Sequence, residues 1–457
     1  MSNLGFHNLF HHVSSFNGIQ AHRFFIEHKE RLFSPDAPGP YFVKTREGIN
    51  LSGYDVVFFS VSFEIGYINM IKMLLLSSIP PVRKDRGAGH PLIIAGGIAV
   101  TANPSFLSGL CDVVYIGDME CSLNKMLEIL FHHSFKKENE VFRELEELEG
   151  VWVPEFSEEV VPRRAVWSLK GEPAHSVIIT KKTEFSGMFL VEIARGCKNL
   201  CRFCMTRCVA SPFRTFPIDE VLSLVKKAHK RTDRVGLIAP VLSDYGELSS
   251  LVRMINGMGI GVSFSSLRAD AFTEEIARLV SENSQSTVTF APETGSAELR
   301  RSIGKTFTNE DLLAATGLAL KHGIRRFRYY FMYGLPGEDI SDIGAIVNLV
   351  SDSLESISRY RGKLHLSVNP FVPKKGTPFE HHKLYPLTYY RDVQAFLKGA
   401  LAGLKNLNIS FESLRHLQLQ YVLSIGGSSA GLLLAEAMVR GNLRGFIPAV
   451  EDLLKNG

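Results

Sequence analysis

The chain has 457 residues, of which 45% are hydrophobic and 21% charged, and its formal net charge is +4. This composition excludes a disordered, collagen-like or disulfide-stapled chain, and its length predicts two or three domains. The charge is too mild, and lysine and arginine are too scattered, to predict a nucleic-acid partner.

The N-terminal sequence MSNLGFHNLFHHV lacks the basic segment and apolar run of a secretory signal. The most apolar stretch, residues 56–81, is interrupted by Glu64, Asn69 and Lys72. A membrane span needs about 20 nearly uninterrupted apolar residues. We therefore expect a cytoplasmic protein with no membrane partner.

The first third of the chain predicts an α/β domain. Apolar runs rich in β-branched and aromatic residues predict buried parallel strands, with helical segments between them, at 54–62, 91–97 and 111–117. This order predicts a Rossmann-like, doubly wound domain over residues 1–133. Its strands end in glycine or small polar turns, where open α/β sheets bind ligands.

Residues 134–186 combine a charged helix with proline-containing extended segments and are expected to form a connector. Six further strands, alternating with helical segments, are predicted at 189–196, 234–240, 260–268, 286–293, 326–334 and 364–371. Six such units over residues 187–383 predict a (β/α)6 partial TIM-type barrel rather than a closed barrel of eight units. Residues 384–457 are expected to be a mainly helical C-terminal region.

Four of the six cysteines lie within residues 197–208, and Cys197, Cys201 and Cys204 have the spacing C-x3-C-x2-C. Such clustering in a reducing compartment indicates a metal site rather than disulfides. Structural zinc normally takes four ligands, often from two C-x2-C pairs, and no second pair exists here. Cys208 could supply a fourth ligand, whereas three thiolates would leave one iron of a four-iron cluster open. The three cysteines directly follow a predicted strand, at the catalytic end of a barrel.

This motif, with Phe203 before the third cysteine, resembles the signature of radical S-adenosylmethionine (SAM) enzymes. The resemblance implies that the three cysteines hold a 4Fe-4S cluster, whose open iron binds the amino and carboxylate groups of SAM. It also implies that SAM is cleaved reductively to a 5'-deoxyadenosyl radical, with an electron donor such as flavodoxin or ferredoxin.

The same resemblance implies further SAM-binding residues. Glu293 matches the carboxylate that binds the ribose, and Arg268 matches the guanidinium that binds the cofactor carboxylate, although a surface ion pair is its alternative. The usual glycine-rich patch is absent, so Ser243 and Asp244 are expected to replace it. Backbone groups that hold adenine are expected at the end of the fifth strand, where a plain turn is the alternative: Tyr333, Gly334 and Leu335.

The first domain resembles the cobalamin-binding domains that precede many radical SAM barrels. This resemblance implies that Ser60, Ser62, Gly96 and Gly97 line a cobalamin site. The D-x-H-x-x-G motif that supplies a histidine to cobalt is absent. Cobalamin is therefore expected to bind without a histidine ligand, or not at all.

Relatives begin this domain with a strand that precedes the segment matching Met1. We therefore expect that the first strand is missing, and that the true start lies upstream or the chain is one half of a split protein.

Several reactions remain open. Methylthiolation is not expected, because it needs three more cysteines in the N-terminal domain, where only Cys111 and Cys121 occur. A one-cluster enzyme with cobalamin would favour methyl transfer to a carbon centre. Without cobalamin, a radical rearrangement or cyclisation is expected, and a non-catalytic iron–sulfur sensor or scaffold is the remaining alternative.

Overall fold

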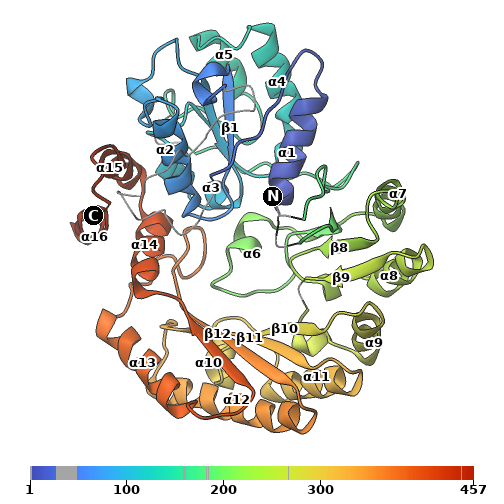
Figure 1. Cartoon of the computed structure of the whole chain (residues 1–457). Coiled ribbons are helices and arrows are strands. Elements are labelled where there is room, and N and C mark those ends of the chain that lie inside the picture. The colour runs from blue at the N-terminus through green and yellow to red at the C-terminus, as the bar shows by residue number, and fades with distance from the viewer. Residues whose placement is uncertain are drawn as a thin grey trace. The chain divides into compact units, whose positions relative to one another are not determined.

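The computed structural model describes residues 3–26, 49–157, 161–181, 183, 185–265, 267–443 and 445–456. The chain divides into two compact units (Figure 1). Unit 1 contains Leu169–Pro373 and Thr377–Leu417, and unit 2 contains Gly5–Ser168, Lys374–Gly376 and Gln418–Gly457.

Unit 2 is built on a sheet of four strands in the order β1-β2-β3-β4. The strands are β1 (Val56–Ser60), β2 (Leu92–Gly96), β3 (Val113–Tyr115) and β4 (Val151–Trp152). The first three are parallel and lie where the sequence predicts them, and β4 is antiparallel to β3. Part of the expected connector, residues 134–186, thus belongs to this sheet.

The helices of unit 2 come from both ends of the chain. They are α1 (Leu4–Ser15), α2 (Gly66–Leu76), α3 (Ile98–Ala102), α4 (Leu123–His132), α5 (Asn139–Glu146), most of α14 (Leu414–Ile425), α15 (Ser428–Val439) and α16 (Phe446–Asn456). Leu423, Leu434 and Val450 share one buried core with Tyr67 and Phe106, and α15 packs beside α2 (Figure 1). The expected helical region 384–457 is therefore not a separate part of the molecule.

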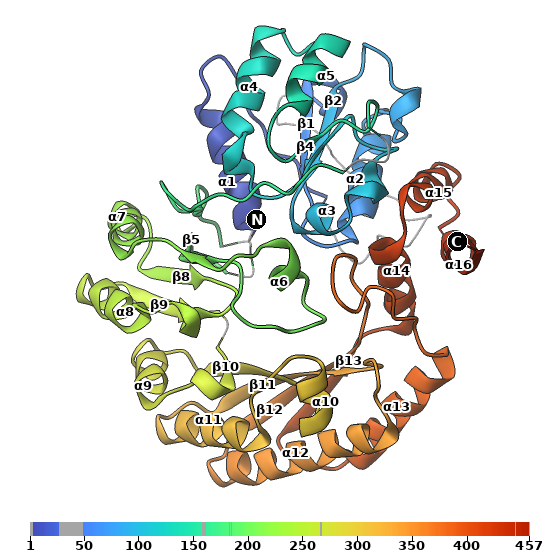
Figure 2. The same ribbon diagram turned by 180° about the vertical axis from the view of Figure 1, so that it is seen from behind.

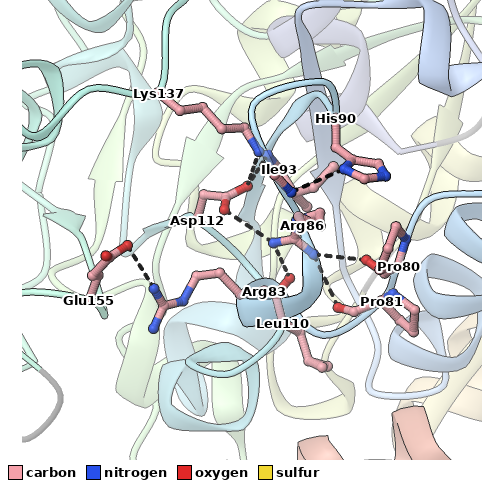
Figure 3. Close-up of polar contacts among 11 residues, drawn as sticks. Pro80, Pro81, Arg83, Arg86, His90, Ile93, Leu110, Asp112, Lys137 and Glu155 are labelled. Carbon is pink, nitrogen blue, oxygen red and sulfur yellow. Dashed lines mark hydrogen bonds and ion pairs between the residues drawn. The ribbon is translucent and has the colours of Figure 1, made fainter.

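A buried ion pair fastens the amino ends of β2 and β3 (Figure 3). The Arg86 side chain is fully buried, and its Nη2 lies 3.2 Å from Asp112 Oδ1. Asp112 Oδ2 accepts a hydrogen bond from the Ile93 N–H at 2.7 Å and lies 3.6 Å from Lys137 Nζ. Arg86 also donates to the carbonyls of Pro80, Pro81 and Leu110. These contacts tie the α2–β2 loop to the start of β3.

Unit 1 contains two parallel sheets. One has the order β5-β8-β9, formed by β5 (Phe189–Glu192), β8 (Arg234–Ile238) and β9 (Gly261–Phe264). The other has the order β10-β11-β12-β13, formed by β10 (Thr287–Glu293), β11 (Arg326–Tyr333), β12 (Lys363–Pro370) and β13 (Leu407–Phe411). All six expected strands are present. No strand pairing joins β9 to β10 among the described residues, and β13 lies in a region expected to be helical.

Helices alternate with these strands. They are α6 (Met205–Val209), α7 (Ile218–Ala228), α8 (Leu248–Gly257), α9 (Glu274–Glu282), α10 (Ala297–Ser302), α11 (Asn309–Lys321), α12 (Ile340–Arg359) and α13 (Leu387–Ala400). Capping boxes at Thr308 and Asp339 define where α11 and α12 begin. Figures 1 and 2 show α7, α8 and α9 along the outer side of the strands. None of the described helices has both the length and the hydrophobicity needed to cross a bilayer.

Candidate active site

The three cysteines of the motif lie on a loop between β6 (Ala194–Arg195) and α6. β6 pairs with β7 (Arg214–Thr215) in a short antiparallel hairpin, which closes the loop at its base. Gly196 has a φ of +78°, and a Cβ there would lie 2.3 Å from the Pro212 carbonyl oxygen. Only glycine fits this close approach, so the backbone geometry requires a glycine directly before Cys197.

A second segment supports the cysteine loop from the turn after α10. The Arg202 N–H donates to the Ile303 carbonyl at 2.9 Å. Gly304 has a φ of +79°, and a Cβ there would lie 2.3 Å from the Leu200 carbonyl oxygen. The path of the cysteine loop is thus set by residues far from it in the sequence.

Cys197, Cys201, Cys204 and Cys208 are all partly buried free thiols. The Asn199 amide lies 3.4 Å from Cys197 Sγ. Burial raises the pKa of Cys201 and also that of Cys208. Among the described residues, no three His, Cys, Asp or Glu side chains converge on one point as they would around a single ion. Three thiols on one braced loop are nevertheless a donor set that suits an iron–sulfur cluster.

Charged side chains from the ends of β9 and β10, and from the turn after α10, lie near Cys201. Burial raises the pKa of this thiol; Lys305 and Arg268 act in the opposite direction, and Glu293 acts in the same direction as burial. The structure therefore brings Arg268 and Glu293, two residues predicted to bind SAM, to the signature cysteines. Arg268 also forms an ion pair with Asp270, with Nε 2.9 Å from Oδ1.

Ser243 and Asp244 end a short 3-10 helix, Leu242–Asp244, which follows β8. Asp244 Oδ2 lies 3.3 Å from the Asn199 amide, and its carbonyl accepts from Lys198 Nζ at 3.4 Å. Burial raises the pKa of Asp244, while Lys198 and Arg268 oppose the rise. The Ser243 hydroxyl is buried and has no hydrogen-bond partner within the described part of the chain. An unsatisfied hydroxyl beside the cysteine loop fits a site that a polar ligand completes.

Glu293, the last residue of β10, is buried and has a φ of +66°. A non-glycine residue in this region is strained and is common at functional sites. Its Oε1 lies 2.6 Å from Lys305 Nζ. Sequence reasoning missed Lys305. Its partner Glu293 is 12 residues earlier in the chain, and the turn that contains α10 brings the two side chains together.

Phe203 packs beside a small apolar cluster that includes Ile303, Leu335 and Phe371. Gly334 and Leu335 belong to a tight turn after β11. The Gly334 N–H donates to the Glu338 carboxylate, and the Leu335 carbonyl accepts from the Glu338 N–H at 3.1 Å. These backbone groups are engaged within the turn, so the expected adenine contact stays a prediction.

Tyr333 and Glu338 are buried next to this turn. The Tyr333 hydroxyl accepts from Gln394 at 2.7 Å, and its carbonyl accepts from the Phe371 N–H at 2.8 Å. Tyr389 donates to Glu338 Oε1 at 2.6 Å. Burial raises the pKa of Glu338 to about 7, although these hydrogen bonds oppose the rise. The Tyr333 side chain is therefore part of the protein core.

In unit 2, Ser60 and Gly96 are paired in register at the carboxyl ends of β1 and β2, and Ser62 lies in the following loop. Gly97 has a φ of +118°, and a Cβ there would lie 2.4 Å from the Val61 carbonyl oxygen. Gly97 is thus required by the close approach of the Val61 backbone, and no cobalamin ligand is needed to explain it. The cobalamin role of all four residues stays a prediction.

The chain was also compared with known proteins. It is 28% identical over 432 residues to the uncharacterized protein MJ0966 of Methanocaldococcus jannaschii, which covers 93% of this chain and 86% of that protein. It is 23% identical over 235 residues to the ribosomal protein uS12 methylthiotransferase RimO of Carboxydothermus hydrogenoformans. That match covers 47% of this chain and about half, 53%, of RimO.

Among solved structures, the fold is similar to that of the radical SAM methyltransferase TsrM from Kitasatospora setae, with a TM-score of 0.50 and 14% identity. The match covers 71% of this chain and 64% of TsrM. A family model described as "Radical SAM proteins, N-terminal" matches residues 5–154, and one described as "Radical SAM superfamily" matches residues 191–350. With both models matched in chain order, the protein belongs to the radical SAM superfamily.

Proposed function

We propose that this protein is an enzyme that cleaves SAM reductively, with a 4Fe-4S cluster held by Cys197, Cys201 and Cys204. The observation that carries the proposal is the turn after α10, which contacts the cysteine loop through Ile303 and Gly304 and pairs Lys305 with Glu293 at 2.6 Å. When bound, the cluster would supply the electron that breaks a carbon–sulfur bond of SAM. An electron donor such as flavodoxin or ferredoxin is the proposed partner.

The residues of the site have distinct proposed roles. Glu293 accepts hydrogen bonds from the ribose hydroxyls, because a carboxylate has enough acceptor positions to serve both Lys305 and the sugar. Ser243 and Asp244 bind the amino group, since one offers an unpaired hydroxyl and the other an acidic oxygen. Arg268 faces the cofactor carboxylate, and Phe203 belongs to the SAM site. Backbone groups of Tyr333, Gly334 and Leu335 hold the adenine. In this proposal the strands of unit 1 correspond to a (β/α)6 partial barrel.

The favoured reaction is methyl transfer to a carbon centre with cobalamin bound by unit 2. Its support is the position of Ser60, Ser62, Gly96 and Gly97 at the carboxyl edge of a parallel sheet, where open α/β sheets bind ligands. A rearrangement or cyclisation without cobalamin is the alternative, because Gly97 is already explained by its contact with Val61.

The test begins with anaerobic reconstitution of the full chain with iron and sulfide, followed by SAM and a strong reductant. We expect 5'-deoxyadenosine from the wild type and none from Cys201→Ala. S-adenosylhomocysteine formed together with 5'-deoxyadenosine would support methyl transfer, whereas 5'-deoxyadenosine alone would support rearrangement. If the reconstituted wild type forms neither product, the proposal fails and the scaffold alternative stands.

Cobalamin binding is tested separately. The protein is incubated with hydroxocobalamin, passed through a desalting column, and examined for the corrin absorption bands. Retained corrin at a ratio near one per chain supports the cobalamin assignment. A corrin-free protein that still cleaves SAM refutes that assignment and leaves the radical SAM activity intact.

A further inference from the structure

Lys305 is a buried lysine whose environment is built from several elements. Its side chain is 9% exposed, and its Nζ lies 2.6 Å from Glu293 Oε1. It also donates to the Ala291 carbonyl and lies 5.6 Å from the centre of the Phe307 ring. Lysine is almost never buried unless its charge is paired, and burying it is costly. The site therefore calls for an explanation beyond packing.

The turn that carries Lys305 is held rigidly by Arg300, which is fully buried. Arg300 donates to the carbonyls of Pro292 and Thr294 at the end of β10, and to Asn309 Oδ1 at 2.7 Å. The same turn contacts the cysteine loop, because Ile303 accepts from the Arg202 N–H. Lys305 therefore has a fixed position relative to both Glu293 and the cysteines.

Lys305 also lies next to the cysteine loop. It directly follows Gly304, where a Cβ would lie 3.4 Å from the Cα of Cys201. A buried positive charge beside this loop would favour the more negative, reduced form of an iron–sulfur cluster bound there.

We propose that Lys305 is a positioning residue that acts on both reactants of the SAM cleavage site. It holds the Glu293 carboxylate so that the second oxygen faces the ribose, and it raises the reduction potential of the cluster next to Cys201. This inference rests on the proposed function.

The test uses Lys305→Met, which keeps the length of the side chain and removes its charge and its hydrogen bonds, and Lys305→Arg, which keeps the charge. The matched control is Lys321→Met, at an exposed lysine on α11 whose side chain is 68% exposed. Cluster content, reduction potential by spectroelectrochemical titration, and SAM affinity by equilibrium dialysis are measured on the reconstituted full chain.

We expect Lys305→Met to shift the potential to more negative values and to weaken SAM binding about tenfold or more, the effect of losing a charge-assisted hydrogen bond. Lys305→Arg should keep the potential close to that of the wild type, but should weaken SAM binding because the larger group displaces Glu293. The Lys321→Met control should match the wild type in both measurements.

Unchanged potential and SAM affinity in Lys305→Met would overturn the inference. If Lys305→Met does not fold, the inference is tested with Lys305→Arg. An unchanged SAM affinity in Lys305→Arg, or a reduction potential that falls although the charge is kept, would contradict the inference. Failure of the underlying function is distinguishable, because the wild type itself would then hold no cluster or would not cleave SAM.

Discussion

Replacing Gly304 by alanine tests whether the turn after α10 sets the path of the cysteine loop. The new Cβ would lie 2.3 Å from the Leu200 carbonyl oxygen, whereas real Cβ contacts stay beyond 3.0 Å. To restore a separation of 3.0 Å from the present 2.3 Å, the backbone next to Cys201 must move by about 0.7 Å. A displacement approaching about 1 Å at a catalytic centre can cost about a hundredfold in rate.

The control for this experiment is Gly323→Ala. Gly323 has a φ of +85°, close to the +79° of Gly304, but a Cβ at Gly323 would meet no atom within 4 Å. Both variants therefore pay a similar strain of about 1–2 kcal/mol for alanine in the left-handed region. Only Gly304→Ala moves the cysteine loop, so the difference between the two isolates that movement.

The assay is iron and sulfide content after anaerobic reconstitution, together with the rate of 5'-deoxyadenosine formation. We expect Gly304→Ala to cleave SAM about ten- to a hundredfold more slowly than Gly323→Ala, or to hold less cluster. Equal cluster content and equal rates in the two variants would refute the reasoning.

Three other predictions follow from the same structure. Cys208→Ser should keep its cluster iron, whereas serine at any of the three signature cysteines should lose it; iron analysis checks this, and iron loss in Cys208→Ser would identify a fourth ligand. Arg86→Met should lower the free energy of unfolding by about 3–5 kcal/mol in urea titrations, because Asp112 stays buried and keeps only Lys137, 3.6 Å away, as an ion-pair partner. Burial raises the pKa of Glu338 from 4.5 to about 7. Between these two pH values the folded state keeps a proton on Glu338 that the unfolded state has lost, so the free energy of unfolding falls as the pH rises through this range. The loss is up to about 3 kcal/mol, and Glu338→Gln should remove it in urea titrations at about pH 5 and about pH 8; an unchanged pH dependence would contradict the assignment.

The main strands of both units could be predicted because their patterns are strong. β11 and β12 are eight-residue runs of alternating burial, and β2 is apolar on both faces. β4 was missed because it has only two residues, and β13 because its half-exposed sequence LNISF lies between helices. Such short or half-polar strands take their structure from pairing with a neighbour, which a local pattern does not contain.

The place of the C-terminal helices could not be predicted either. The apolar face of α15 indicates that it is buried, but not against which domain. In the structure, Asn103 donates to the carbonyls of Ser424 and Gly426, and this contact joins the two ends of the chain within unit 2. Contacts between residues so far apart leave no trace in local periodicity.

The candidate site was only partly predictable, because some of its features are local in the sequence and others depend on long-range contacts. The spacing of the three cysteines is local, so it could be read directly, and the family resemblance pointed to Arg268 and Glu293. Lys305 was missed, because a buried ion pair depends on where two separate turns meet. The role of Gly304 was also hidden, since the group that excludes a side chain there is the Leu200 carbonyl.

The most direct test of the central claim is the electron paramagnetic resonance spectrum of the anaerobically reconstituted, reduced protein, recorded before and after SAM is added. If three thiolates leave one iron open, the protein should show the signal of a reduced 4Fe-4S cluster, and SAM should change it. A protein that holds zinc instead, or a cluster signal that SAM leaves unchanged because Cys208 already fills the fourth position, would contradict the account.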